Sequence, residues 1–147
     1  MYVGDAYELE KRDIHMGIDI QAPARTPVRA FYSGRIYGLK DNNQPLDYGP
    51  TIVTEHFINE TKYWVLWGHL SRESLCRWQV GDPFNGGDEI ATLGEPEVNG
   101  GWPSHLHFQV SLVEPDDVNF PGVVSEGQLE AALKRYPDPR CFLGPIY

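Results

Sequence analysis

Residues 105–113, HLHFQVSLV, alternate between polar and apolar side chains with a period of two. Successive side chains of a β-strand point to opposite faces of its sheet, so this pattern predicts a strand with one buried face. The apolar face would hold Leu106, Phe108, Val110 and Leu112, and the polar face His105, His107, Gln109 and Ser111. A fold that contains this strand must bury one side of a sheet and place two histidines together on the other side.

A second stretch near the start of the chain follows the same pattern. In residues 14–20, IHMGIDI, every second residue is apolar. We therefore predict another strand, which places His15, Gly17 and Asp19 on its polar face.

The remainder of the chain is rich in turns and in short β-prone runs. Its 15 glycines and 12 prolines indicate many turns. Residues 51–58 and 62–70 are separated by Asn-Glu-Thr, which predicts a hairpin. Residues 28–39 predict a strand pair or a kinked strand, residues 89–94 a short strand, and residues 125–136 one helix with Ser125 as its N-cap. The predicted fold is therefore mainly β, with antiparallel connections and one short C-terminal helix.

Length and charge limit the classes of protein that this chain can belong to. At 147 residues it is predicted to form one domain, with a motif-bearing core at about 13–113 and a C-terminal extension at 114–147. A net charge of −9 argues against binding to nucleic acid or to an anionic surface. No run is long enough to span a membrane, and the first 13 residues contain no apolar core of a signal peptide. We therefore expect an intracellular chain or a segment of a longer one.

Five side chains on the predicted strands are of the types that bind zinc or transfer a proton. A zinc hydrolase needs three protein ligands, an open position and a group that accepts a proton from water. The candidates are His15, Asp19, His69, His105 and His107. His56 is interpreted as an ordinary hydrogen-bonded strand residue. Cys76 and Cys141 lie far apart without C-x-x-C spacing and are interpreted as free thiols, with a disulfide between them as the alternative.

These motifs occur in an order that resembles a known family. HMGIDIQAPARTPVRAFYSGRI, DYGPTIVTEH, WGHLS, GDEIATLG and PSHLHFQV, which span residues 13–112, resemble the lysostaphin/LytM-type zinc metallopeptidases. The resemblance implies antiparallel sheets of the LytM, or duplicated-hybrid-motif, type with an active-site groove across one sheet. It also implies that His15, Asp19 and His107 bind one Zn²⁺, whereas His105 and His69 line the site. We expect His105 to be the general base and His69 to stabilise the tetrahedral intermediate, although these two roles can be exchanged.

The sequence departs from the family pattern near the expected groove. Arg25 replaces the usual glycine before Thr-Pro, and residues 101–104 read GWPS where Thr-Gly-Pro is common. These departures affect the expected substrate preference and not the metal site. Four aromatic residues are candidates for lining a substrate groove, with Trp64 expected in the core: Tyr48, Trp64, Trp67 and Trp102. The C-terminal tail loosely resembles the end of such domains where they are joined to a class III aminotransferase, so another domain of a longer chain is a candidate partner.

Three functions are compatible with these residues. The favoured one is a zinc-dependent endopeptidase that hydrolyses short peptide bonds, by resemblance those of bacterial peptidoglycan cross-links or stem peptides, which would place it in the cell envelope. The alternative is a zinc-binding, non-hydrolysing regulatory or scaffolding domain. The third is a phosphocarrier domain with two facing histidines, which would not need Asp19. Zinc content separates the phosphocarrier from the other two, and turnover separates the enzyme from the non-hydrolysing domain.

Overall fold

The structure is a computed structural model that describes residues 14–15, 17–45, 47–98, 101–120, 123–124 and 126–137. Its strands are β1 (Ile14–His15), β2 (Ile18–Gln21), β3 (Pro27–Arg29), β4 (Gly34–Asn42), β5 (Gly49–Ile58), β6 (Thr61–Gly68), β7 (Pro83–Phe84), β8 (Glu89–Thr92), β9 (His105–Ser111) and β10 (Val123–Val124). Its helices are α2 (Arg72–Cys76) and α3 (Glu126–Arg135).

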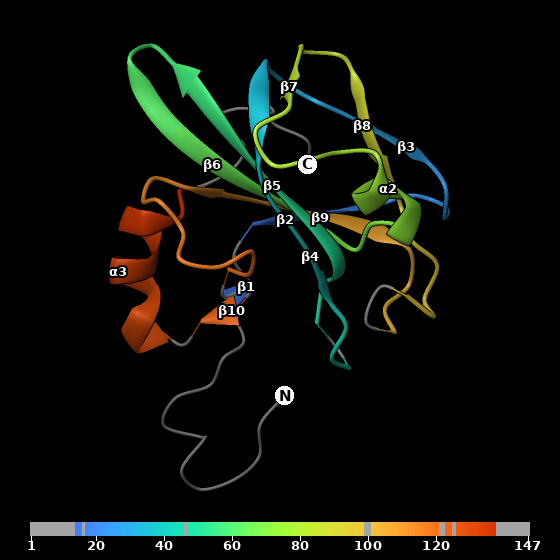
Figure 1. Cartoon of the computed structure of the whole chain (residues 1–147). Helices are drawn as coiled ribbons and strands as arrows, with labels where there is room; N and C mark the ends of the chain where they lie inside the picture. Colours follow the sequence, from blue (N-terminus) through green and yellow to red (C-terminus); the bar gives the residue numbers. More distant parts are fainter. Residues whose placement is uncertain are drawn as a thin grey trace, which may run out of the picture.

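A six-stranded sheet dominates the molecule (Figure 1). The strands lie in the order β2-β9-β6-β5-β4-β7, and every neighbouring pair is antiparallel. Two further antiparallel pairs, β1-β10 and β3-β8, flank this sheet. The prediction of a mainly β fold with antiparallel connections is confirmed.

The hairpin predicted at residues 51–70 is formed by β5 and β6. Its pairing continues to the last residues before the turn, where Ile58 opposes Thr61. The two turn residues, Asn59 and Glu60, have φ angles of 50° and 67°. A two-residue turn with both φ angles positive matches the right-handed twist of the flanking strands, which explains why this short loop closes the hairpin.

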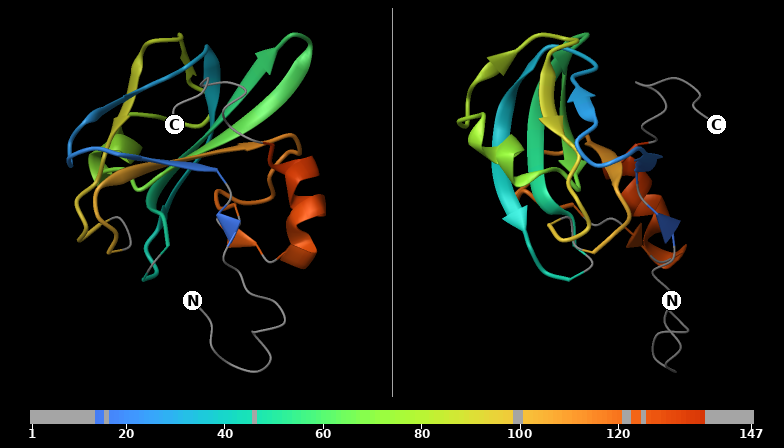
Figure 2. Two further views of the ribbon diagram at one scale, coloured as in Figure 1. Left: turned by 180° about the vertical axis from the view of Figure 1, so that it is seen from behind. Right: turned by 90° about the vertical axis from the view of Figure 1, so that its right-hand side faces the viewer.

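Each face of the six-stranded sheet is covered by a different apolar cluster. On one face, β3, β8 and α2 pack over the sheet around Ile52, Trp67 and Phe108. On the opposite face, α3 and Phe120 pack over Val53 and Leu66. Figure 2 shows α3 and the β3–β8 pair on opposite sides of the sheet. Full burial of a side chain such as Phe108 contributes roughly 2–3 kcal/mol, so both clusters stabilise the sheet substantially.

The expected strand at residues 14–20 is interrupted, which corrects the prediction of one continuous strand. β1 pairs with β10, whereas β2 pairs with β9. Between them Gly17 adopts a φ of 91° and packs so closely on β9 that an added Cβ would lie 2.6 Å from the carbonyl oxygen of Phe108. This left-handed backbone redirects the chain, and it is accessible because glycine has no side chain.

The helical content also differs in part from the prediction. The C-terminal helix is present as α3, and the predicted cap Ser125 lies outside the described residues. The five-residue helix α2 was not predicted, because a single turn carries too little periodicity. Cys76 is a free, exposed thiol, while Cys141 lies outside the described residues. Among the described residues, no helix combines the length and the apolar character needed to cross a membrane.

Candidate active site

Asp19 and His107 are directly opposed across the β2–β9 pair. The Asp19 Oδ1 atom lies 3.1 Å from His107 Nδ1 and 3.7 Å from His105 Nε2. His107 is 2% exposed, whereas the Asp19 side chain is 42% exposed. The structure therefore brings Asp19, His105 and His107 together at a place that is closed behind the histidines and accessible at the carboxylate.

His69 joins this group from the end of β6. Gly68 opposes His107 in the sheet, so the next residue lies beside the histidines of β9. The His69 ring centroid is 4.2 Å from that of His105 and 6.4 Å from that of His107. His69 has a φ of 63°, an uncommon value for a residue other than glycine. Its backbone is held there because its N–H donates to Tyr48 O and its carbonyl accepts from the Gly94 N–H, at 2.8 and 2.9 Å.

The ring nitrogens of the two β9 histidines have different polar partners. His105 Nδ1 lies 2.6 Å from the carbonyl oxygen of Pro103, an obligate acceptor, so this nitrogen donates and Nε2 carries the lone pair. His107 lies between two acceptor oxygens, with Nε2 2.8 Å from Gln109 Oε1 and Nδ1 3.1 Å from Asp19 Oδ1, so the tautomer of its ring sets which of the two nitrogens donates. His105 Nε2 and His107 Nδ1 both face Asp19 Oδ1.

This arrangement fits a bound cation. A carboxylate oxygen and an imidazole lone pair repel each other at 3.1 Å unless a proton or a metal ion lies between them. Imidazole nitrogen and carboxylate oxygen are common zinc donors. Within the part of the chain that the structure describes, no group of three candidate ligands is found at metal-binding distance. The third predicted ligand is His15, whose backbone pairs with Val123 and whose side chain lies outside the described residues, so its role stays a prediction.

Tyr48 lies behind the histidines and is not a wall of an open groove. Its ring centroid is 4.9 Å from that of His107 and 5.7 Å from that of His69, and the residue is only 7% exposed. Burial raises the pKa of Tyr48, so the phenol stays neutral and donates a hydrogen bond to Phe120 O at 2.7 Å. Gly68 makes room for the ring, because a Cβ there would lie 2.9 Å from Tyr48 Cδ1.

Of the tryptophans named from the sequence, Trp102 is the one beside the histidines. Its ring centroid lies 6.2 Å from that of His69 and 6.4 Å from that of His105, and it is 38% exposed. Trp64 is buried, as predicted. Trp67 was a candidate for the groove, but it is buried in the apolar cluster on the opposite face of the sheet.

His56 lies away from the site, as interpreted from the sequence. It is buried on the face opposite the other histidines, where it contacts Phe31 and Phe84. Burial lowers the pKa of His56. Its hydrogen bonds go to Thr54 Oγ1 and to Ser33 O, at 2.7 and 3.0 Å.

Gln109 was assigned no role from the sequence. It is fully buried and is the acceptor for His107 Nε2. The only sequence signal for it was its position two residues after His107, on the same face of the predicted strand.

The sequence model of peptidase family M23 matches residues 13–119. The fold is similar to the catalytic domain of lysostaphin, an antimicrobial peptidase from Staphylococcus simulans, with a TM-score of 0.58 and 24% identity over 80% of this chain and 79% of that one. It is also similar to the catalytic domain of a mutant of EnpA, a prophage-encoded M23 protein from Enterococcus faecalis, with a TM-score of 0.57 and 24% identity over 74% of this chain and 77% of that one.

A third similar structure is a putative peptidase M23 from Pseudomonas aeruginosa. Its TM-score is 0.61 at 20% identity, over 90% of this chain and 45% of that one. No curated protein sequence matches significantly. At these identities the structural likenesses define the fold, and the family match rests on the sequence model.

Proposed function

The chain belongs to peptidase family M23, and from that premise we propose that it is a zinc-dependent endopeptidase. The favoured substrates are short, flexible peptides, with bacterial peptidoglycan cross-links or stem peptides as the specific proposal. The observation that supports this most directly is the convergence of two imidazole nitrogens, His105 Nε2 and His107 Nδ1, on one partly exposed carboxylate, that of Asp19.

His15, Asp19 and His107 would hold the metal. When bound, zinc supplies Lewis acidity toward the scissile carbonyl and the attacking water. One carboxylate and two neutral imidazoles leave a dipositive ion with a net positive charge, which favours a developing oxyanion.

His105 is proposed as the general base. Its Nδ1–H is held by Pro103 O, so Nε2 is oriented toward Asp19 and can accept a proton there. His69 lies against His105 and is proposed to donate a hydrogen bond to the developing oxyanion.

Trp102 is proposed as one wall of the substrate site. It is an exposed aromatic ring beside both proposed catalytic histidines, where it can cover the apolar part of a bound peptide. The chain has a net charge of −9, so electrostatic attraction to anionic wall polymers is not expected. We therefore propose that another domain or a partner brings the site to its substrate in the cell envelope.

The test combines metal analysis with a cleavage assay. Zinc-loaded protein is incubated with peptidoglycan sacculi and with pentaglycine, and new amino termini are measured. His107→Ala should lose both zinc and activity. His105→Ala should retain zinc and lose about 10²–10⁴-fold in rate, the usual effect of removing a general base.

His56→Gln is the matched control, because His56 is a buried histidine on the opposite face and should not alter zinc content. Equal zinc loss in the His105 and His107 variants would show that the division between ligand and base is wrong. Full zinc occupancy without cleavage of either substrate would contradict the endopeptidase proposal and favour the alternative, a zinc-binding, non-hydrolysing domain.

A further inference from the structure

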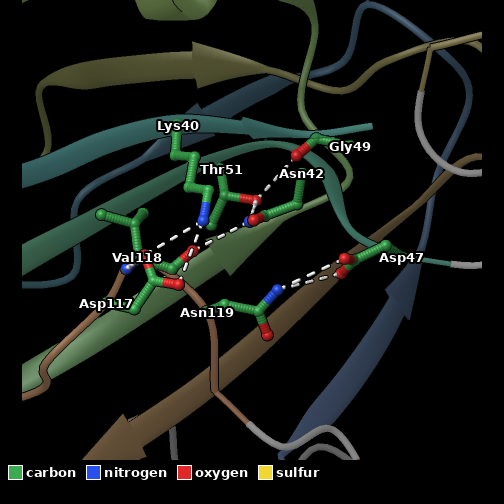
Figure 3. Close-up of polar contacts among 8 residues, drawn as sticks. All are labelled: Lys40, Asn42, Asp47, Gly49, Thr51, Asp117, Val118 and Asn119. Carbon is green, nitrogen blue, oxygen red and sulfur yellow. Dashed lines mark hydrogen bonds and ion pairs between the residues drawn. The ribbon is translucent and has the colours of Figure 1, made fainter. Parts of the chain in front are cut away.

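The segment that follows β9 returns along β4 and the loop after it. Residues 114–120, here called the brace, make polar contacts in strict chain order with residues 37–48. The pairs are Tyr37 with Glu114, Lys40 with Asp117, Asn42 with Val118, Asp47 with Asn119, and Tyr48 with Phe120. Figure 3 shows the three central pairs. Ordered contacts of this kind fix the register of the brace on the sheet.

The brace is attached most firmly at its Phe120 end. The Lys40–Asp117 ion pair has side chains 45% and 57% exposed, and exposed pairs contribute little stability. Asn42 is 4% exposed and donates to Val118 O at 2.8 Å and to Thr51 Oγ1 at 3.0 Å. Buried hydrogen bonds are costly to break, because they leave a polar group unsatisfied away from water.

The Phe120 end of the brace is connected to the histidines through Tyr48. Phe120 O accepts the hydroxyl proton of Tyr48, whose ring contacts His107 and whose carbonyl accepts the His69 N–H. A displacement of Tyr48 would therefore move a ring that packs on His107 and a carbonyl that holds the His69 backbone.

The chain beyond the brace pairs with β1, the strand that carries the proposed ligand His15. β10 pairs with β1, and in this register Val123 opposes His15. Helix α3 and the residue after it pack against the end of the brace. Ala132 and Tyr136 lie in the same apolar cluster as Phe120, and the Tyr136 ring centroid is 5.5 Å from that of Phe120. The family match ends at residue 119, so Phe120, β10 and α3 all lie outside it.

We propose that the brace and its continuation through β10 position the metal-binding and catalytic histidines, with Tyr48 as the positioning residue that connects them. The inference rests on the proposed function, in that it assigns His15 and His107 to the metal. On this proposal, Phe120 and β10, which lie beyond the family match, help to position the active-site histidines.

The test compares two identical substitutions at opposite ends of the brace. Tyr48→Phe removes the hydroxyl that bonds Phe120 O, and Tyr37→Phe removes the hydroxyl that bonds Glu114 Oε2. Zinc affinity is measured by competition with a chromophoric chelator, kcat and KM are measured on the cleaved substrate, and the histidine rings are followed by ¹H–¹⁵N spectra.

Tyr48→Phe should weaken zinc binding about 10-fold, as expected for loss of a residue that orients a ligand, and should lower kcat with little change in KM. It should also shift the ring resonances of His107 and His69. Tyr37→Phe should leave all of these unchanged, although it also removes a hydrogen bond to the brace. A second variant, Val123→Pro, disrupts the pairing of β10 with β1 and should weaken zinc binding at least as much.

Wild-type zinc affinity and unshifted histidine resonances in Tyr48→Phe would overturn the inference and leave the brace a purely stabilising element. If the wild-type chain itself binds no zinc, the proposed function fails. The ring resonances of the two tyrosine variants, measured without metal, still decide whether the brace positions the histidines.

Discussion

At the residue scale, the chemistry of the site depends on which nitrogen of each imidazole carries the proton. His105 and His107 lie two residues apart on one strand, yet their ring nitrogens have different partners. His105 Nδ1 meets the backbone carbonyl of Pro103, whereas His107 meets Gln109 Oε1 at Nε2 and Asp19 Oδ1 at Nδ1. The two rings therefore present different nitrogens to Asp19, Nε2 from His105 and Nδ1 from His107.

Gln109 is expected to hold His107 in its ligand orientation. Gln109→Leu removes the acceptor and should weaken zinc binding by about 10–100-fold, the usual cost of losing a partner that orients a metal ligand. Gln109→Glu keeps an acceptor at Nε2 and should weaken binding less. Zinc affinity is measured by chelator competition.

Ser111→Ala is the control, because Ser111 is the next residue on the same face and its hydroxyl bonds Val113 O, not a histidine. Similar zinc affinities in the Ser111 and Gln109→Leu variants would contradict a specific role for Gln109.

The sequence identified the shared face of His105 and His107, because strict alternation leaves no other geometry for a strand. It did not identify the contact between His107 and Gln109 or the left-handed backbone of His69. Both depend on the local fit of rings and carbonyls from separate strands, which has no signature in a single strand's pattern.

At the scale of elements, long β-rich runs were predicted well and short or interrupted elements were not. The β5–β6 hairpin was predictable because two β-prone runs flank a short polar turn. The division of residues 14–20 into β1 and β2 was not, because Gly17 fits the alternating pattern equally well as a strand residue and as a break. The pairing of β1 with β10 also requires a contact across more than 100 residues that no local pattern encodes.

The hairpin turn gives a prediction at this scale. Glu60 has a φ of 67°, which costs a side-chain-bearing residue roughly 1 kcal/mol and costs glycine almost nothing. Glu60→Gly should therefore raise the free energy of unfolding by up to about 1 kcal/mol, measured by urea denaturation.

Glu97→Gly is the matched control, since Glu97 is an exposed turn residue without a positive φ. It should be neutral or destabilising, because glycine adds entropy to the unfolded chain there without relieving strain. A stabilising effect of equal size at both positions would show that the left-handed turn is not the cause.

At the scale of the whole molecule, the six-stranded sheet separates two kinds of histidine. His69, His105 and His107 lie together at one site, while His56 is buried on the other face among aromatic rings. His56 takes part in a directed chain of hydrogen bonds in which Trp67 donates to Thr54, and Thr54 donates to His56 Nε2. A proton on Nε2 would oppose the Thr54 hydroxyl proton and would break this chain.

His56 should make the fold less stable in mild acid. Burial holds its native pKa below the ordinary value of 6.5, so below about pH 6.5 the unfolded chain binds a proton that the folded chain does not. Stability from this group is therefore fully present above pH 6.5 and is lost as the pH falls, with a slope of up to about 1.4 kcal/mol per pH unit. His56→Gln removes this titration, although it also removes packing and so lowers stability at every pH.

Urea unfolding of the wild type and of His56→Gln at pH 7.5 and pH 5.5 separates the two effects. The stability difference between wild type and variant should be large at pH 7.5 and should narrow at pH 5.5, because only the wild type is destabilised by protonation of residue 56 in its unfolded state. The other histidines are common to both proteins and cancel in this difference. A difference that is the same at both pH values would mean that His56 titrates alike in the folded and unfolded chains, and that its burial does not keep it neutral.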